Sequence, residues 1–517
     1  MLARLKTLTT VGLNAHIVDV EVDTLINSGS PNANPTITTV GLPEKAVRES
    51  SQRVRRAISN AGFRSPYDHI TINLAPAELP KHAASFDLPI AIGMLASTDS
   101  LVHDRLLEYA IVGELSLAGE TRPVRGALSM AIATAKAKNL RGIIVPSDNG
   151  REASVVEGID VIPVDTLQET VAFLDDKLEI PPLETLTNSL LQDNDHLLDY
   201  ADVRGQEMAK RALVIAAAGV HNILMIGSPG AGKTMLAKRL PTILPLLTTI
   251  ESIEASQIYS VLGRLPDNTP LLTQRPFRSP HHTISQAGLV GGGSIPLPGE
   301  ISMSHNGVLF LDELPEFSRQ TIEVLRQPME DKQVTISRAK GSATFPADFM
   351  LVAAMNPCPC GYNNDPNRSC QCFSPLIERY LSKISGPMLD RIDIQVEIPA
   401  VPFKYLSAAV DGTSSSEMVS DVKRARIKQA ARFENLPIRY NSQLPGPQIR
   451  RLCHLTTDAR VTLGQSITEL GFSARTHDKI LCVAQTIADL DDASEIDTHH
   501  IHEAVNYRLL DRRYWNR

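Results

Sequence analysis

The chain has 517 residues, of which 43% are hydrophobic and 21% are charged, and its formal net charge is −7. This composition is typical of a globular chain of roughly three domains and excludes a disordered one. The negative net charge argues against a protein coated with basic residues for nucleic acid, although DNA contacts concentrated in one groove or pore stay compatible with it. Aromatic residues make up only 4%, which argues against a broad base-stacking platform.

The sequence carries no signal for a membrane or an export pathway. No apolar run approaches the roughly 18 residues that a spanning helix needs, and the first twenty residues lack the apolar segment and cleavage site of a secretory signal. Six cysteines do not form a disulfide scaffold in a chain of this length. We therefore expect a cytoplasmic protein with no membrane contact.

The first third of the chain alternates strand and helix patterns. β-branched alternation predicts strands over residues 17–26 and 69–75, and amphipathic spacing predicts a helix over residues 42–59. A second strand–helix passage covers residues 109–147. Residues 1–173 are therefore predicted to form one domain of mixed α/β order.

A polar linker is predicted over residues 174–198, which contain paired prolines and no clear period. Residues 199–402 follow with continuous apolar strands separated by helices, a pattern typical of a parallel sheet covered on both faces. Residues 403–517 are mostly helical in pattern after a joint, DGTSSSE. The predicted fold class is thus multidomain α/β with a C-terminal helical domain.

A phosphate-binding loop follows the first buried strand of the central domain. The segment GSPGAGKT fits the pattern GxxxxGK(S/T) and lies between a strand and a helix, where backbone N–H groups and the helix N-terminus cradle phosphates. Lys233 is expected to reach the β- and γ-phosphates, and Thr234 to supply a hydroxyl to Mg²⁺. The predicted ATP-binding residues are Gly227, Ser228, Pro229, Gly230, Ala231, Gly232, Lys233 and Thr234.

Acidic and amide side chains end the two later strands. In VLFLDE, Asp312 is expected to hold Mg²⁺, and Glu313 to orient or deprotonate the attacking water. Asn356 ends FMLVAAMN and is expected to position water near the γ-phosphate, although an asparagine before a proline is often only a turn residue. Together with the loop, these residues predict an ATP hydrolase.

Four cysteines form the pattern CxC-x9-CxC at Cys358, Cys360, Cys370 and Cys372. Two close thiol pairs suit a structural Zn²⁺ ion, but the spacing is not the usual CxxC, and free thiols in a loop are the alternative. Metal analysis of the purified protein distinguishes the two.

These motifs resemble the magnesium-chelatase-like AAA+ ATPases of the ComM/YifB family, the competence-type branch-migration helicases. The resemblance implies a central AAA+ domain with a helical lid and assembly into a hexameric ring. It also implies a DNA motor that acts on recombination intermediates in natural transformation. It covers nearly the whole chain and is carried by residues 40–58, 72–93, 277–293, 298–317, 355–362 and 471–490.

The resemblance also assigns two arginines. Arg391, in LDRID, resembles an arginine finger that enters the ATP site of the neighbouring subunit, and Arg475, in SAR, resembles a second sensor of the γ-phosphate. A surface ion pair is the plainer interpretation of either side chain. If Arg391 acts on the neighbour, an isolated protomer binds ATP but hydrolyses it poorly.

Two inserts resemble the pore elements of replicative helicases. Residues 285–299 are glycine-rich, and residues 334–346 are predicted to form a β-hairpin. Arg338 and Lys340 near its tip are candidates for contacts with DNA phosphates. A charged hairpin tip that is merely solvated is the alternative. His281 and His282 stay unassigned, with packing the favoured interpretation.

Residues 113–146 and 80–86 resemble the proteolytic domain of Lon, which implies a Lon-protease-like α+β fold for residues 1–173. Lon-type hydrolysis needs a serine activated by a lysine. Ser85 falls near the position of the nucleophile, but Leu128 stands at the position of the lysine.

Two other lysines, Lys136 and Lys138, lie two or more helical turns beyond this position, too far to replace the missing lysine. We therefore expect a scaffold or partner-docking domain that lacks the Ser–Lys dyad. The favoured function is an ATP-driven DNA helicase or translocase. The alternatives are an ATP-driven protein remodeller and the motor of a metal chelatase, and stimulation of ATPase by DNA discriminates among them.

Overall fold

The computed structural model describes residues 2–25, 36–41, 45–64, 69–79, 81, 84–98, 101, 105–185, 198–266, 269–338, 341–363, 365, 368–401 and 412–515. The chain forms two compact units. Unit 1 contains Met1–Gln192 and Thr248–Thr273, and unit 2 contains Asp193–Leu247 and Gln274–Arg517. None of the described helices is long and apolar enough to cross a membrane.

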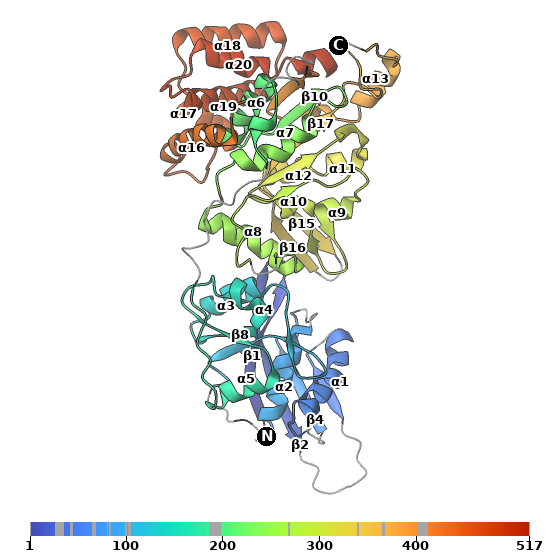
Figure 1. The fold of residues 1–517 in the computed structure, drawn as a ribbon, viewed down its shortest axis with the longest axis vertical. Coiled ribbons are helices and arrows are strands. Elements are labelled where there is room, and N and C mark those ends of the chain that lie inside the picture. The colour runs from blue at the N-terminus through green and yellow to red at the C-terminus, as the bar shows by residue number, and fades with distance from the viewer. Residues whose placement is uncertain are drawn as a thin grey trace. The chain divides into compact units, whose positions relative to one another are not determined.

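Unit 1 is built on a mixed seven-stranded sheet in the order β3-β4-β2-β1-β5-β8-β9 (Figure 1). The strands β1, β2 and β4 pair antiparallel, whereas the remaining neighbours pair parallel. The strands are β1 (Leu2–Val11), β2 (Asn14–Leu25), β3 (Ile37–Val40), β4 (His69–Ala75), β5 (Tyr109–Ile111), β8 (Gly142–Pro146) and β9 (Asp160–Val164), with a small ribbon of β6 (Glu114–Leu115) and β7 (Thr121–Arg122). The predicted strands at 17–26 and 69–75 are confirmed.

The helices of unit 1 pack on this sheet. Every residue of α2 is buried, which explains its continuous apolar sequence, DLPIAIGMLA. The helix predicted over residues 42–59 is present as α1 in the described part of that segment. The helices are α1 (Lys45–Asn60), α2 (Asp87–Ala96), α3 (Ala127–Lys136), α4 (Ser147–Ala153) and α5 (Leu167–Leu174).

A further helix of unit 1 comes from the middle of the chain. Helix α8 (Thr249–Leu262) begins with a capping box, in which Thr248 and Glu251 satisfy each other's backbone N–H groups. Its Ile253 packs with Leu271 against Leu128 and Val155 of unit 1. This apolar contact explains why Thr248–Thr273, which lies within the predicted central domain, clusters with the first domain instead.

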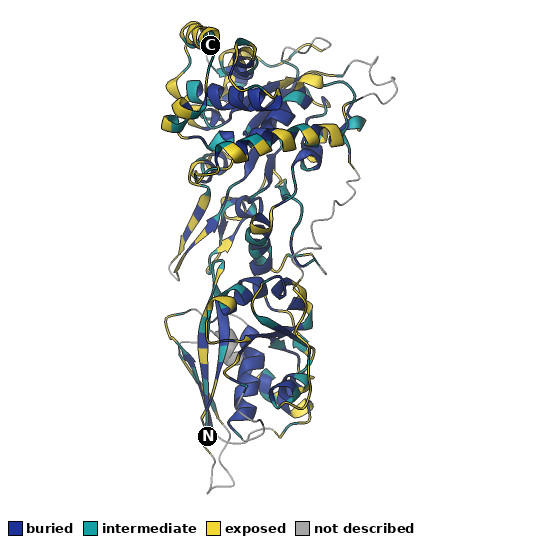
Figure 2. Ribbon diagram, turned by 90° about the vertical axis from the view of Figure 1, so that its left-hand side faces the viewer, coloured by how far each residue is buried: buried dark blue, intermediate teal, exposed yellow. Residues whose placement is uncertain are grey.

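Unit 2 contains a parallel five-stranded sheet in the order β11-β14-β17-β10-β18. Its main strands are buried along their length, as Figure 2 shows in dark blue and as their continuous apolar sequences require. The strands are β10 (Ile223–Gly227), β11 (Phe277–Arg278), β14 (Val308–Leu311), β17 (Met350–Met355) and β18 (Ile394–Ile398). The predicted parallel α/β sheet is confirmed.

Helices surround this sheet and continue into a C-terminal helical bundle, as predicted. Those of the sheet domain are α6 (Glu207–Gly219), α7 (Lys233–Arg239), α9 (Gln286–Val290), α10 (Glu300–Met303), α11 (Arg319–Glu323), α12 (Arg326–Asp331), α13 (Ser374–Leu381) and α14 (Gly386–Leu389). Those of the C-terminal bundle are α16 (Ser415–Arg432), α17 (Gly446–Leu452), α18 (Thr457–Leu470), α19 (Ala474–Leu490) and α20 (Thr498–Asn506).

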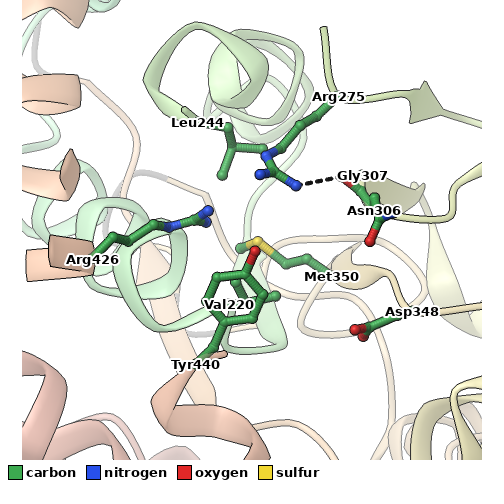
Figure 3. Close-up of a pocket in the computed structure, with 9 residues that line it drawn as sticks. All are labelled: Val220, Leu244, Arg275, Asn306, Gly307, Asp348, Met350, Arg426 and Tyr440. Atoms are coloured by element: carbon green, nitrogen blue, oxygen red, sulfur yellow. Dashed lines mark hydrogen bonds between the residues drawn. The ribbon is translucent and has the colours of Figure 1, made fainter. Parts of the chain in front are cut away.

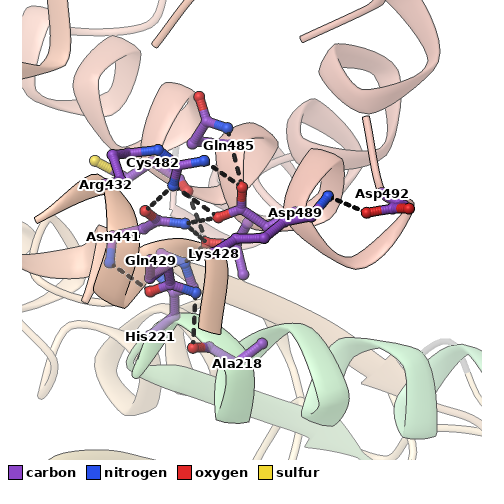
Figure 4. Close-up of polar contacts among 11 residues, drawn as sticks. Ala218, His221, Lys428, Gln429, Arg432, Asn441, Cys482, Gln485, Asp489 and Asp492 are labelled. Atoms are coloured by element: carbon purple, nitrogen blue, oxygen red, sulfur yellow. Dashed lines mark hydrogen bonds and ion pairs between the residues drawn. The ribbon is translucent and has the colours of Figure 1, made fainter. Parts of the chain in front are cut away.

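A buried polar network holds the C-terminal helices together (Figure 4). The carboxylate of Asp489 accepts hydrogen bonds from Arg432, Asn441 and Gln485. The network reaches α6 through Gln429, whose amide donates to the carbonyl of Ala218 at 3.1 Å. Because the groups of this network satisfy one another, these contacts fix the bundle against the sheet domain.

Candidate nucleotide-binding site

The phosphate-binding loop lies between β10 and α7, as predicted. Gly230 (φ +79°) and Gly232 (φ +93°) occupy the left-handed region that favours glycine. Gly227 has a different reason, because a Cβ atom there would lie 2.3 Å from the carbonyl oxygen of Ile398 in the neighbouring strand. The loop therefore needs glycine both for its turn and for the packing of β18 on β10.

Lys233 begins α7 and is buried, with 8% of its surface exposed. Its ammonium group donates to the carbonyl oxygens of Gly227 (2.6 Å) and Ser228 (3.0 Å) and to Oδ1 of Asn356 (3.1 Å). Burial lowers the pKa of this lysine, while the carboxylates of Asp312 and Glu313 oppose that shift. The amine is thus held over the loop, close to acidic groups, where a phosphate could replace its carbonyl partners.

Thr234 and Asp312 meet directly. The hydroxyl of Thr234 donates to Oδ2 of Asp312 at 2.6 Å, although the strands that precede them, β10 and β14, are separated by β17. A hydroxyl and a carboxylate side by side are oxygen ligands of the kind that Mg²⁺ prefers, with waters and phosphate oxygens to complete its shell. The residues present therefore fit a Mg²⁺ ion that accompanies a nucleotide.

Glu313 follows Asp312 in a left-handed conformation (φ +52°), and its side chain is about half exposed. Its Oε2 atom lies 3.5 Å from Nδ1 of His282. His282 has no role that the sequence alone assigns, but this position makes it a neighbour of the predicted catalytic carboxylate. No local pattern in the sequence indicates this position, which arises because the segment SPHHT follows β11, whose Phe277 pairs with Val308 of β14.

Asn356 lies just beyond β17 and contacts the loop through Lys233. The structure thus brings together the predicted residues of one chain: Lys233, Thr234, Asp312, Glu313 and Asn356. It does not add Arg475, which is exposed in the first turn of α19.

Arg391 is held away from the phosphate-binding loop of its own chain. Its guanidinium group pairs with Glu330 and donates to the carbonyl oxygen of Pro387 at 2.6 Å. Its backbone is fixed by Asn222, whose side chain donates to the carbonyl oxygen of Arg391 at 3.0 Å. The plainer interpretation of Arg391, an ion pair, therefore describes the single chain.

A buried charge cluster supports the same segment. Asp393 pairs with Lys479 of α19 at 2.6 Å and accepts a hydrogen bond from the backbone N–H of Asn222 at 2.9 Å. Burial acts to raise the pKa of Asp393, but Lys479 and His221 outweigh it and hold that pKa well below its usual range. The ionised carboxylate therefore ties the arginine-bearing segment to both the sheet and the lid.

The two predicted inserts lie side by side. The glycine-rich insert forms a short ribbon of β12 (Gly291–Gly292) and β13 (Leu297–Pro298), and the predicted hairpin is present as β15 (Gln333–Arg338) and β16 (Gly341–Pro346). A Cβ atom on Gly292 would lie 3.5 Å from the guanidinium group of Arg338. Arg338 is exposed, and Lys340 lies outside the described residues.

The four cysteines converge. The sulfur of Cys358 lies 3.3 Å from that of Cys360 and 3.7 Å from that of Cys370, and Cys360 and Cys370 are 3.6 Å apart. All four sulfurs, including that of Cys372, lie within 4.8 Å of one another. Thiolates at about 2.3 Å from a tetrahedral Zn²⁺ are about 3.8 Å apart, so the arrangement fits one metal ion.

The thiols of this group differ in acidity. Burial raises the pKa of Cys358 to about 12. Burial acts on Cys360 too, but the backbone N–H groups of Tyr362 and Gln371 outweigh it and lower the pKa of this thiol to about 6. Because the lowered pKa favours the thiolate form of Cys360, this residue can be the first ligand to bind a metal ion.

The residues at the two positions of a Lon-type Ser–Lys dyad, Ser85 and Leu128, do not form a catalytic pair. The side chain of Ser85 is buried, and Leu128 is part of an apolar cluster. Lys136 and Lys138 are exposed, and the buried Lys81 donates all three of its protons to backbone carbonyls. No described lysine in this set is free to activate the serine.

A small cavity lies at the opposite end of the parallel sheet (Figure 3). Arg275 and Arg426 point into it, and the guanidinium group of Arg426 lies 4.7 Å from the centre of the Tyr440 ring. Asn306 and Asp348 line it just before β14 and β17 begin. The cavity is therefore at the amino ends of the strands, away from the phosphate-binding loop at their carboxyl ends.

A parallel sheet, a glycine loop leading into α7, an acidic strand end and a helical lid define a phosphate-loop ATPase domain of the AAA+ class. The sequence matches the family described as "Magnesium chelatase, subunit ChlI" over residues 199–406 and its C-terminal domain over residues 412–508. A third match, "Subunit ChlI of Mg-chelatase", covers residues 22–149.

The chain belongs to the ComM/YifB-type magnesium-chelatase-like family. It is 45% identical to "Uncharacterized protein YifB" of Escherichia coli over 99% of this chain and 98% of that protein. It is 43% identical to "Competence protein ComM" of Haemophilus influenzae over 97% and 96%. The "Magnesium-chelatase 67 kDa subunit" of Chlorobaculum parvum is 26% identical over 31% of this chain and 24% of that protein.

Proposed function

We propose that this chain is an ATP hydrolase that works as a hexameric ring and drives the movement of DNA. The observation that carries the ATPase assignment is that Lys233, Thr234 and Asp312 lie together at the carboxyl edge of the parallel sheet. Asn356 accepts a hydrogen bond from Lys233, and Glu313 follows Asp312 directly. In this proposal ATP and Mg²⁺ are the cofactors, and Glu313 activates the attacking water.

Arg391 is proposed to complete the site of the next subunit, and Arg475 to sense the γ-phosphate within its own. The position of Arg391 supports this division, because it lies on a segment anchored by Asp393 and not at its own phosphate-binding loop. A ring makes such an arginine useful, since it adds positive charge to the transition state only when a neighbour is present.

DNA is the proposed substrate of the motor, in single-stranded or branched form. Support comes from the exposed Arg338 beside the glycine-rich ribbon, where a basic side chain and a close backbone suit a phosphate chain. The relative named "Competence protein ComM" adds support for a role in natural transformation.

The test is ATP turnover with and without single-stranded, forked and four-way DNA. We expect stimulation by at least one DNA, together with displacement or migration of a labelled strand. Reversing the charges of both Arg338 and Lys340 should abolish DNA binding and leave the turnover measured without DNA unchanged. If none of these DNAs changes the rate of ATP turnover, the second candidate, a chelatase-type or protein-remodelling motor, is favoured. The match to the magnesium-chelatase family supports that candidate.

A structural zinc ion is proposed at Cys358, Cys360, Cys370 and Cys372. The four sulfur atoms lie within 4.8 Å of one another, and this spacing supports the proposal because it is the spacing of thiolate ligands around one tetrahedral Zn²⁺ ion. Elemental analysis of the purified chain should find zinc at one per chain, and a metal content near zero would reject the site.

A further inference from the structure

The segment that carries the four cysteines touches the phosphate-binding loop at three separate points. The first is Asn356, two residues before Cys358, whose Oδ1 atom accepts the hydrogen bond from Lys233 at 3.1 Å. A shift of the first cysteine pair would therefore move the acceptor of the ammonium group that is expected to bind phosphate.

The second and third points lie between the cysteine pairs. Gly361 (φ +86°) packs so closely on the loop that a Cβ atom there would lie 2.5 Å from the ring of Pro229. Asp365 accepts a hydrogen bond from the hydroxyl of Ser228 at 2.6 Å. The cysteine-bearing segment thus contacts Ser228 and Pro229 of the phosphate-binding loop through both its backbone and a side chain.

In its described residues this segment is shaped by local contacts and not by regular secondary structure, and these contacts include a hydrogen bond from the backbone N–H of Arg368 to Asp365 at 3.1 Å. The described residues between β17 and α13 form no helix or strand, and the backbone bonds within it include Gly361 to Cys358 (2.9 Å) and Asp365 to Tyr362 (3.1 Å). A metal ion bound by four thiolates supplies a restraint of this kind, because its binding free energy becomes folding free energy of the loop.

We propose that a thiophilic divalent metal ion at the four cysteines braces the phosphate-binding loop, so that metal occupancy sets the affinity for nucleotide. This inference rests on the proposed metal site and on the proposed role of the loop in ATP binding. The metal acts through Asn356, Gly361 and Asp365 and touches neither nucleotide nor Mg²⁺. Loss of the metal releases all three contacts together.

The first experiment removes the metal from the full-length protein. Zinc per chain is measured by elemental analysis, and the affinity for a fluorescent ATP analogue is measured at constant Mg²⁺. Replacement of both Cys370 and Cys372 by serine should remove the zinc and weaken nucleotide binding about tenfold or more. Cys453→Ala, a buried cysteine of the lid, is the matched control and should keep both metal and affinity.

The second experiment breaks one link and keeps the metal. Asp365→Ala should retain one zinc per chain and still weaken nucleotide binding several-fold, because Ser228 loses its acceptor. Asp365→Asn should weaken nucleotide binding less than Asp365→Ala does, since its amide oxygen can still accept from the hydroxyl of Ser228, although the backbone N–H of Arg368 then loses its acceptor. This pair keeps the inference testable even if the double serine variant does not fold.

The outcomes separate the proposals. Zinc present in the unmodified chain, but with nucleotide affinity unchanged in the serine variant and in Asp365→Ala, would overturn the brace and leave the metal site standing. An unmodified chain that contains no metal would overturn both. An unmodified, zinc-loaded chain that binds no ATP analogue would overturn the proposed function itself.

Discussion

The hydroxyl of Thr234 donates a hydrogen bond of 2.6 Å to Asp312, although a third strand separates the two strands that precede these residues. The contact joins the first turn of α7 to the carboxyl end of β14 and places two oxygen ligands where a Mg²⁺ ion would accompany the phosphates. The parallel sheet is what makes this meeting possible, because the carboxyl ends of its strands share one edge.

Glu313→Gln should bind ATP like the unmodified chain but hydrolyse it at least about 10²-fold more slowly. The glutamine keeps the size and polarity of the side chain and loses only the ability to take a proton. The measurement is kcat under saturating ATP beside the dissociation constant of a fluorescent analogue.

A nearby carboxylate provides the control for this variant. Glu316 pairs with Lys383 at 3.7 Å and lies on the turn that follows Glu313. Glu316→Gln should leave turnover within a factor of about two or three, as expected for an exposed ion pair. Equal losses in the two variants would contradict the special role of Glu313.

Arg391→Ala and Glu313→Gln should complement each other when mixed. Each is expected to be inactive alone, but a mixed ring contains sites that combine Glu313 of one subunit with Arg391 of its neighbour. Turnover is measured for each variant alone and after mixing and reassembly at equal total concentration. A mixture no more active than its components would show that Arg391 does not act on the neighbouring site.

Asp489→Ala should destabilise unit 2 strongly. Arg432, Asn441 and Gln485 all donate to this buried carboxylate, and removing it leaves a largely buried guanidinium group without its partner. Breaking a buried pair in this way costs about 3–5 kcal/mol. Urea unfolding monitored by circular dichroism measures the change.

The ion pair of Asp492 and Lys428 lies beside this network in Figure 4 and is the matched control. Because Asp492 is largely exposed, solvent screens the pair, and Asp492→Ala should shift the unfolding midpoint far less than Asp489→Ala. Similar shifts in the two variants would mean that the buried network contributes no more than a surface contact.

Glu152→Gln should make unit 1 more stable at alkaline pH and change its pH dependence. Burial raises the pKa of Glu152 above its ordinary value of 4.5, although the side-chain amide of Asn149 donates a hydrogen bond to the carboxylate at 2.6 Å and opposes that shift. A raised folded-state pKa means that the contribution of this group to stability is full below pH 4.5 and is lost as the pH rises through the folded-state value. Each tenfold difference between the folded-state and unfolded-state acidity constants of the carboxyl group corresponds to a loss of about 1.4 kcal/mol.

Thermal unfolding of the unmodified chain, of Glu152→Gln and of a control variant at pH 5 and pH 8 measures this effect. The glutamine variant should gain more over the unmodified chain at pH 8 than at pH 5, whereas Glu157→Gln, at an exposed site nearby, should follow the unmodified chain at both. Parallel pH dependence in all three proteins would show that Glu152 is not destabilised by its burial.

The motifs local in sequence were the predictable part of this molecule. The strand, glycine loop and helix around Lys233 are contiguous, and the apolar run before Asp312 is long enough to indicate a buried strand. The strand that leads to His282, by contrast, is only two residues long, too short to show any period. Its relation to Glu313 therefore emerged only from the pairing of β11 with β14.

Contacts between distant segments were the unpredictable part. The pairing of Arg391 with Glu330 spans 61 positions, and nothing in either local sequence indicates the other. The spacing of the cysteines argued against convergence in a regular strand, but the segment is irregular, and Gly361 has a left-handed backbone that turns the chain. Helix α8 has a sequence with little amphipathic character, TIESIEASQIYSVL, which does not reveal the domain that it covers.

The placement of α8 bears on how the protein is made. Translation delivers Met1–Gln192 first, but the helix that covers Leu128 and Val155 follows only after β10 and the phosphate-binding loop have been synthesised. When residues 1–192 leave the ribosome, their apolar surface around Leu128 and Val155 therefore stays exposed until Thr248–Thr273 has been synthesised. A nascent chain stalled before residue 248 should be bound by chaperones more strongly than one stalled beyond residue 273.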